Sequence, residues 1–189
     1  MSSQNASELV IAGTGNVYVA PFGTTLPTTI DGALNGNFFK LGYVTEDGIK
    51  IKSSPTVDEY KAWQSRYPVR RSLTALDVDI TFTLEQWNEV TLQTALGGGA
   101  VTEYASGKFK YVPVSDTEQL DEVSIVAEWQ DGTKNYRYVI AKGQATESVE
   151  IDLQRTALAL LPVTIKTLGQ AGVDPYQIYT DDPSFVAGS

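Results

Sequence analysis

Residues 76–85 read LDVDITFTLE, and this stretch decides the class of fold. Its even-numbered positions are all apolar and its odd-numbered positions are all polar. Successive side chains of a β-strand point to opposite faces of a sheet, so the pattern predicts a long strand with one face on a core and the other toward water. Because period-two patterns dominate the chain, the sequence predicts a β-rich protein.

The dipeptide Asp131-Gly132 predicts a tight turn between two strands. A two-residue type I′ turn needs positive φ at both central positions, which Asp-Gly tolerates, and it would set Gln130 opposite Thr133. The register that follows brings apolar residues together on one face, as a half-buried hairpin requires. Its expected pairs are Ala127 with Tyr136, Ile125 with Tyr138, Val123 with Ile140 and, on the reverse face, Glu128 with Asn135.

Residues 146–153 alternate again and predict a third strand, with Glu150 and Asp152 on its polar face. This run leads into ALALLPVTIKTL, residues 157–168. Proline donates no hydrogen bond to a ladder, so Pro162 predicts an edge, a bulge or a break in that strand.

One helix is expected over residues 86–96, where the apolar residues fall on one side. Thr83 and Gln86 have the spacing of a capping box at its start. The three glycines at 97–99 predict its end, because glycine adopts the left-handed stop conformation without a Cβ clash.

Two segments show no clear secondary-structure pattern. Residues 53–72 are polar and aromatic, and a connection of this length in a compact domain is usually functional or disordered. Residues 169–189 contain several glycines and prolines and predict an extended tail. No domain-scale linker interrupts the chain, so residues 1–189 are expected to form a single domain.

The chain has no histidine and no cysteine. This excludes cysteine nucleophiles, serine–histidine triads, disulfides and zinc sites built on thiolates or imidazoles. Asp77 and Asp79 share a strand face, but alternate acidic residues are more typical of a wet strand surface than of a metal or acid–base site. We therefore expect no catalytic residue, metal or cofactor. No apolar run approaches the roughly 20 residues of a membrane helix, so no membrane partner is expected.

The formal charge of −9 is unevenly distributed. Residues 50–71 carry six basic and two acidic residues, whereas the rest of the chain carries eight basic and twenty-one acidic residues. Such a segment can be a nucleic-acid patch, a docking arm for an acidic copy of the protein, or a solvated loop. Trp, Tyr and Arg dominate binding energy at protein interfaces, and the acidic remainder would repel phosphate, so a protein interface is favoured over nucleic acid. The candidate contact residues are Lys50, Lys52, Tyr60, Trp63, Arg66, Tyr67, Arg70 and Arg71.

Three strings near the N-terminus occur in a characteristic order: VYVAPFGTTLPT at 17–28, LGYVTEDGI at 41–49 and KAWQ at 61–64. Together they resemble the major tail protein of long-tailed, non-contractile bacteriophages, the subunit that polymerises into the tail tube. The resemblance is strong over about the first 65 residues and one of general pattern beyond them.

The resemblance implies a β-sandwich or partly closed barrel of two sheets with one flanking α-helix. It also implies rings, usually of six subunits, that stack into a hollow tube for DNA ejection. Residues 1–14 would be an N-terminal arm, 46–72 an extended loop reaching the next ring, and 169–189 a C-terminal tail. The implied partners are copies of the chain and the tape measure, tail tip or baseplate, and tail terminator proteins. The protein would be made in the host cytoplasm and end in the virion.

DNA would pass through such a tube without specific binding. An acidic wall would let DNA slide, and two pairs of carboxylates are candidates for it: Asp77 with Asp79, and Glu150 with Asp152. Either pair could equally face the outside of the tube. The alternative function is a monomeric β-sandwich module that binds a ligand or carbohydrate, which the tyrosine and tryptophan content permits.

Overall fold

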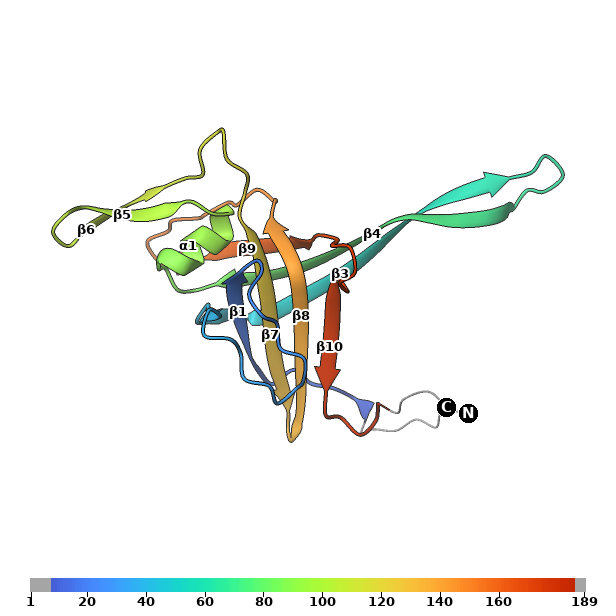
Figure 1. Ribbon diagram of the computed structural model, residues 1–189, viewed down its shortest axis with the longest axis horizontal. Coiled ribbons are helices and arrows are strands. Elements are labelled where there is room, and N and C mark those ends of the chain that lie inside the picture. The colour runs from blue at the N-terminus through green and yellow to red at the C-terminus, as the bar shows by residue number, and fades with distance from the viewer. Residues whose placement is uncertain (1–7, 186–189) are drawn as a thin grey trace.

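The computed structural model describes residues 8–185, which form ten β-strands and one short α-helix (Figure 1). Eight strands join one sheet in the order β2-β1-β7-β8-β9-β4-β3, with β10 also paired to β8, and β5 and β6 form a separate ribbon. The mainly β class, with two sheets and one flanking helix, is therefore confirmed, and the large sheet is not a closed barrel. The strands are β1 Thr14–Pro21, β2 Phe39–Lys40, β3 Val44–Lys61, β4 Pro68–Leu84, β5 Ala100–Ala105, β6 Lys108–Val112, β7 Glu122–Asp131, β8 Lys134–Ala145, β9 Leu161–Thr167 and β10 Tyr176–Thr180, and the helix is α1 Glu89–Leu96.

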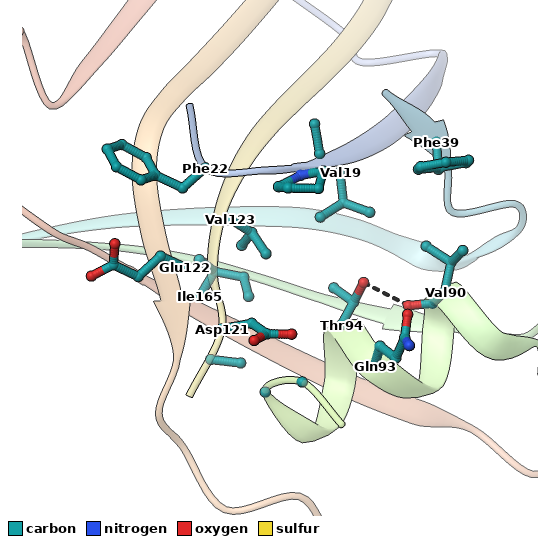
Figure 2. A pocket seen from close by; sticks show the side chains of 15 residues that line it. Val19, Phe22, Phe39, Val90, Gln93, Thr94, Asp121, Glu122, Val123 and Ile165 are labelled. Carbon is teal, nitrogen blue, oxygen red and sulfur yellow. Dashed lines mark hydrogen bonds between the residues drawn. The ribbon is translucent and has the colours of Figure 1, made fainter. Parts of the chain in front are cut away.

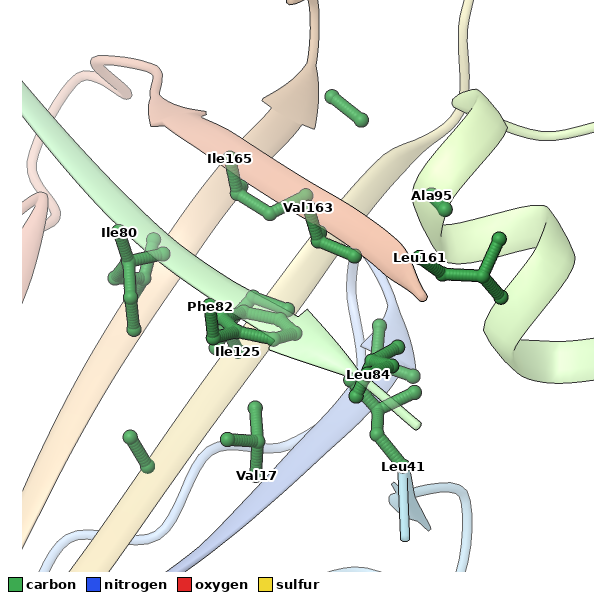
Figure 3. Close-up of a cluster of buried hydrophobic side chains, with 14 of the residues drawn as sticks. Val17, Leu41, Ile80, Phe82, Leu84, Ala95, Ile125, Leu161, Val163 and Ile165 are labelled. Atoms are coloured by element: carbon green, nitrogen blue, oxygen red, sulfur yellow. The ribbon is translucent and has the colours of Figure 1, made fainter. Parts of the chain in front are cut away.

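The core forms where the large sheet folds back on itself. Strands β4 and β9 cross over β1, β7 and β8, and the apolar faces of the two layers meet (Figure 3). The alternation predicted for residues 76–85 is confirmed from Val78 to Leu84, where each even-numbered side chain is buried. Leu76 is exposed because β4 has left the body of the protein at that point. The buried set includes Val17, Leu41, Ile80, Phe82, Leu84, Ile125, Tyr138, Ile140, Leu161, Val163 and Ile165.

The hairpin of β7 and β8 is present, but its predicted register is wrong by two residues. Asp131 pairs with Lys134, so the turn is Gly132-Thr133. Gly132 has a φ of +60° and no non-glycine residue of the described chain has positive φ, which is the pattern of a type II′ turn. A shift of two residues keeps every side chain on its predicted face. The observed pairs are Ala127 with Tyr138, Ile125 with Ile140, and Glu128 with Arg137.

Helix α1 begins later than predicted, at Glu89. Its N-cap is Asn88, whose side chain accepts a hydrogen bond from the Thr91 backbone N–H at 3.0 Å, and the Thr91 hydroxyl accepts one from the Asn88 backbone at 2.9 Å. The capping box predicted from Thr83 is therefore wrong, because Thr83 belongs to β4. The predicted end is confirmed, since Gly97 caps the helix with a φ of +76°. Over residues 8–185, this one helix is much too short to cross a bilayer.

Residues 146–160 are not a strand, which corrects the prediction for 146–153. An alternating sequence forms a strand only where another strand can pair with it, and no strand of the described residues pairs with this segment. Its contacts with the body include Ile151, which packs on the core, the Ala159 carbonyl, which accepts a hydrogen bond from the Trp87 indole at 2.7 Å, and Glu147, which forms an ion pair with Lys166 at 2.7 Å. The expectation of an edge at Pro162 is confirmed, because β8 pairs only with the other half of β9.

The described part of the predicted C-terminal tail is bound to the body rather than free. Strand β10 pairs with β8, and the turn after it is held by two carboxylates. Asp181 accepts hydrogen bonds from the Asn135 backbone N–H at 2.6 Å and its side-chain amide at 2.7 Å. Buried Asp182 accepts a hydrogen bond from the Tyr136 hydroxyl at 2.5 Å and pairs with Lys134 at 3.0 Å. Residues 186–189 of the tail and 1–7 of the predicted N-terminal arm lie outside the described residues.

A buried arginine attaches the long β1–β2 connection to the sheet. The Arg137 guanidinium donates to the carbonyl oxygens of Thr29 at 2.5 Å and Gly32 at 2.9 Å, and it pairs with Glu128 at 2.6 Å. Residues 22–38 therefore lie across one face of β7 and β8 (Figure 1). This connection contains the second half of the string VYVAPFGTTLPT.

We predict that Gly132→Val lowers the free energy of unfolding by about 1–2 kcal/mol, because a β-branched residue is strained at positive φ. The space around Gly132 is open, so backbone strain is the only expected effect. Thermal melting monitored by circular dichroism measures the change. The matched control is Gly36→Val, at another open glycine without positive φ. Equal melting temperatures for the two variants would contradict the turn assignment.

We predict that Asp182 makes the fold acid-sensitive. Its hydrogen bonds, with the one from Tyr136 first, hold the pKa of the carboxyl well below its usual range. A lowered pKa stabilises the fold above the unfolded value of about 3.9, and this stability is lost as pH falls. Asp182→Asn should therefore melt at a lower temperature at neutral pH and lose less stability than the wild type between about pH 5 and about pH 3. The control is exposed Asp116→Asn, which should follow the wild type at every pH.

Candidate assembly surfaces

The hairpin of β3 and β4 extends out of the body as a long ribbon (Figure 1). Strand β4 pairs with β9 only from Asp79 to Leu84, and its other residues pair with β3 alone. We call residues 53–78 the arm. The segment 53–72, which carried no pattern in the sequence, is thus an extended β-hairpin. A two-stranded ribbon is marginally stable in water by itself, so a partner surface would stabilise the arm.

An apolar stripe continues from the core along one face of the arm. Paired residues of a ladder share a face, and Ile51 lies opposite the core residue Ile80. Further out on the same face, Val57 lies opposite Leu73, beyond a bulge in β4. We call Ile51, Val57, Leu73 and Leu76 the apolar stripe. All four are exposed, and Leu73 keeps 60% of its surface in water.

The tip of the arm is aromatic and basic. Trp63 lies in the turn between β3 and β4 and is 98% exposed, which is extreme for an indole. Residues 60–71 contain four basic residues and no acidic residue. Arg71 pairs with Glu59 within the arm at 2.9 Å, which leaves Lys61, Arg66 and Arg70 as the remaining cations of this segment.

The predicted contact residues all lie on this hairpin but are distributed along it. Trp63, Arg66 and Tyr67 are in the tip, and Tyr60 lies opposite Arg70 next to it. Lys50 and Lys52 lie near the body instead, opposite Thr81 and Asp79. Sequence reasoning missed the apolar stripe, because the bulge at residues 73–75 breaks the alternation that would have revealed it.

The four candidate lumen carboxylates do not share a common structural setting. Asp77 and Asp79 lie on the polar face of β4, with Asp79 beside Lys52 and Lys166 in the ladder. Glu150 and Asp152 are exposed in the 146–160 connection, so their predicted strand face is wrong. Within residues 8–185, no three acidic side chains converge as a metal site would require.

A pocket of about 340 Å³ opens between α1, β1 and the start of β7 (Figure 2). We call it the α1 pocket. Phe22, which follows β1, and Phe39, the first residue of β2, line it beside two carboxylates. Glu122 pairs with Lys142 at 2.9 Å, while the Asp121 side chain forms no ion pair or hydrogen bond with the described residues. Apolar walls come from Val19, Val90, Val123, Ala145 and Ile165.

A second, larger groove of about 770 Å³ runs between β1 and the base of the arm. Its walls include Tyr43, Ile49 and Trp129. One cation, Lys40, and one carboxylate, Glu46, lie among its lining residues, so this groove has no net charge.

Comparison with known proteins assigns the chain to a family. A family model described as phage tail tube protein matches residues 2–188. Among solved structures, one similar chain comes from the tail of an empty GTA particle refined with C6 symmetry; it is 13% identical, with a TM-score of 0.38, over 89% of this chain and 96% of that chain. No curated protein matches the sequence. Because the family model spans nearly the whole chain, the chain belongs to the phage tail tube proteins, a non-enzymatic family of structural components of the virion tail.

Proposed function

We propose that the chain assembles with copies of itself into stacked rings of six subunits, which form the tube through which DNA leaves the virion. The observation that carries the proposal is the apolar stripe, because the apolar face of the core continues along the arm without cover. Contiguous exposed apolar surface on a soluble protein usually marks an interaction site. The number six comes from the family resemblance.

The unpaired sheet edges also favour assembly. Strands β2 and β3 end the path of the large sheet, and β10 pairs with β8 alone. An exposed edge offers unpaired N–H and C=O groups to another chain. In a closed ring, each subunit would pair its exposed edges with those of its neighbours, so no unpaired edge would remain between subunits.

The other components of the tail enter the proposal as partners. The tube would form around the tape measure protein, start on the tail tip or baseplate, and end at the tail terminator protein. Synthesis in the host cytoplasm followed by incorporation into the virion fits a chain without cysteine, because no disulfide has to form.

We predict that the paired substitutions Val57→Ser and Leu73→Ser block tube formation and leave the subunit folded. The two side chains oppose each other on the apolar stripe and already face water in the single chain, so the melting temperature should change little. The matched control is Thr56→Ser with Ala75→Ser, the neighbouring pair on the opposite face. Sedimentation and negative-stain electron microscopy, with and without tail-tip complex, measure assembly. If the wild type stays monomeric at high concentration with tail tips present, a monomeric binding module becomes the better function.

We propose in addition that the tube wall is acidic along the DNA path, and Glu150 and Asp152 test this. Changing both to Lys should preserve the tubes and slow DNA ejection, because a cationic wall holds phosphate by releasing counterions. Ejection should recover as salt is raised. The control pair, Glu150→Gln with Asp152→Asn, removes charge without reversing it and should have a smaller effect. Normal, salt-independent ejection from the lysine variant would place these carboxylates away from the DNA.

A further inference from the structure

We propose that the tip of the arm, centred on Trp63, docks into the α1 pocket of a neighbouring copy of the chain. This inference rests on the self-assembly proposed above and identifies which surface receives the arm. Trp63 at the tip is almost fully exposed among residues 8–185, and the α1 pocket is an apolar recess with acidic side chains beside it (Figure 2).

The shape and apolar character of the two surfaces match. The pocket volume of about 340 Å³ is at the lower end of the range for sites that enclose small molecules, which suits one bulky side chain. Phe39 offers aromatic surface against which an indole can pack, while the Phe22 ring on the other side of the pocket already has the Lys142 ammonium 4.8 Å from its centroid. Tryptophan is among the residues that most often supply binding energy when buried in the pocket of a partner. Trp63 is 98% exposed in the single chain, so docking would remove nearly all of its surface from water.

The charges of the two surfaces are complementary. Asp121 and Glu122 line the α1 pocket, and none of its lining residues is Lys or Arg. Glu122 is already paired with Lys142, so Asp121 remains available to a cation of the arriving tip. Residues 60–71 contain no acidic residue and bring Lys61, Arg66 and Arg70, in addition to Arg71, which is paired with Glu59. Opposite charges of this kind select the partner and the orientation of an interface.

The placement of the two surfaces suits a head-to-tail assembly. The arm extends from one end of the long axis of the molecule, and α1 lies toward the opposite end, beside the β5–β6 ribbon (Figure 1). A contact between two different surfaces of identical subunits can propagate through a ring or along a stack of rings. The larger groove is a poorer receptor, because it lies at the base of the arm and its lining has no net charge.

Cysteine cross-linking tests the contact directly, because the natural chain has no cysteine. The test variant combines Gln64→Cys, beside Trp63, with Pro21→Cys at the rim of the α1 pocket, which leaves the aromatic wall in place. The matched control combines Gln64→Cys with Tyr43→Cys in the larger groove. Residues 21 and 43 are both exposed, so both variants should fold. Assembled tubes are treated with a short bis-maleimide and separated on a denaturing gel.

We expect a ladder of covalent oligomers from the Pro21→Cys variant and none from the Tyr43→Cys variant. A ladder from the control alone, or from neither variant in well-formed tubes, overturns the docking proposal and leaves self-assembly intact. Failure of the wild type to form any polymer overturns both proposals.

A charge substitution provides an independent measurement. Asp121→Arg should raise the protein concentration needed for assembly by about tenfold or more, because it places like charges together at the contact. Asp116→Arg, on the same connection but outside the pocket, introduces the same charge and should assemble as the wild type does. Equal effects of the two substitutions would show that only net charge matters and would contradict docking at Asp121.

Discussion

The apolar face of β4 is the constraint on which the rest of the structure depends. From Val78 to Leu84 this face forms one side of the core, and β1, β7 and β9 are arranged around it. Toward Pro68 the same strand continues with its apolar residues in water. The inner half of this one strand is therefore covered by its own chain, while the described residues leave its outer half exposed to the neighbouring subunit that we propose.

Buried polar contacts hold the loops around the core in place, and the arm extends from this part of the protein. Arg137 holds the β1–β2 connection on β7 and β8 through two carbonyl groups and Glu128. Asp182 attaches the turn after β10 to the start of β8, and its hydrogen bond raises the pKa of Tyr136 to about 12. These polar contacts lie away from the arm, so a neighbour that binds the arm does not compete with the interactions that maintain the fold.

Local chemistry in the sequence predicted those features that need no partner. The strand at Val78–Leu84, the existence of a hairpin at Gly132, though not its turn type or register, and the helix stop at Gly97 follow from alternation and from the freedom of glycine. The predictions failed where a partner decides the outcome. Residues 146–153 alternate but find no neighbouring strand, while 53–72 do not alternate and yet form a hairpin across bulges. The α1 pocket could not be predicted, because it joins residues about 100 positions apart that only the folded sheet brings together.

The uneven charge gives the proposed assembly a direction. The bodies of two subunits carry excess negative charge and repel each other, whereas the tip of the arm is positive and is attracted to either body. Apolar attraction has no orientation of its own, so the exposed stripe alone would permit many arrangements of two copies. Repulsion between the two acidic bodies disfavours arrangements in which these surfaces meet. Attraction of the basic tip to an acidic body favours arrangements in which the arm of one copy contacts the body of the other. Salt screens both effects over a Debye length of about 8 Å at physiological ionic strength, so high salt should weaken the selection of one arrangement more than the apolar contact itself.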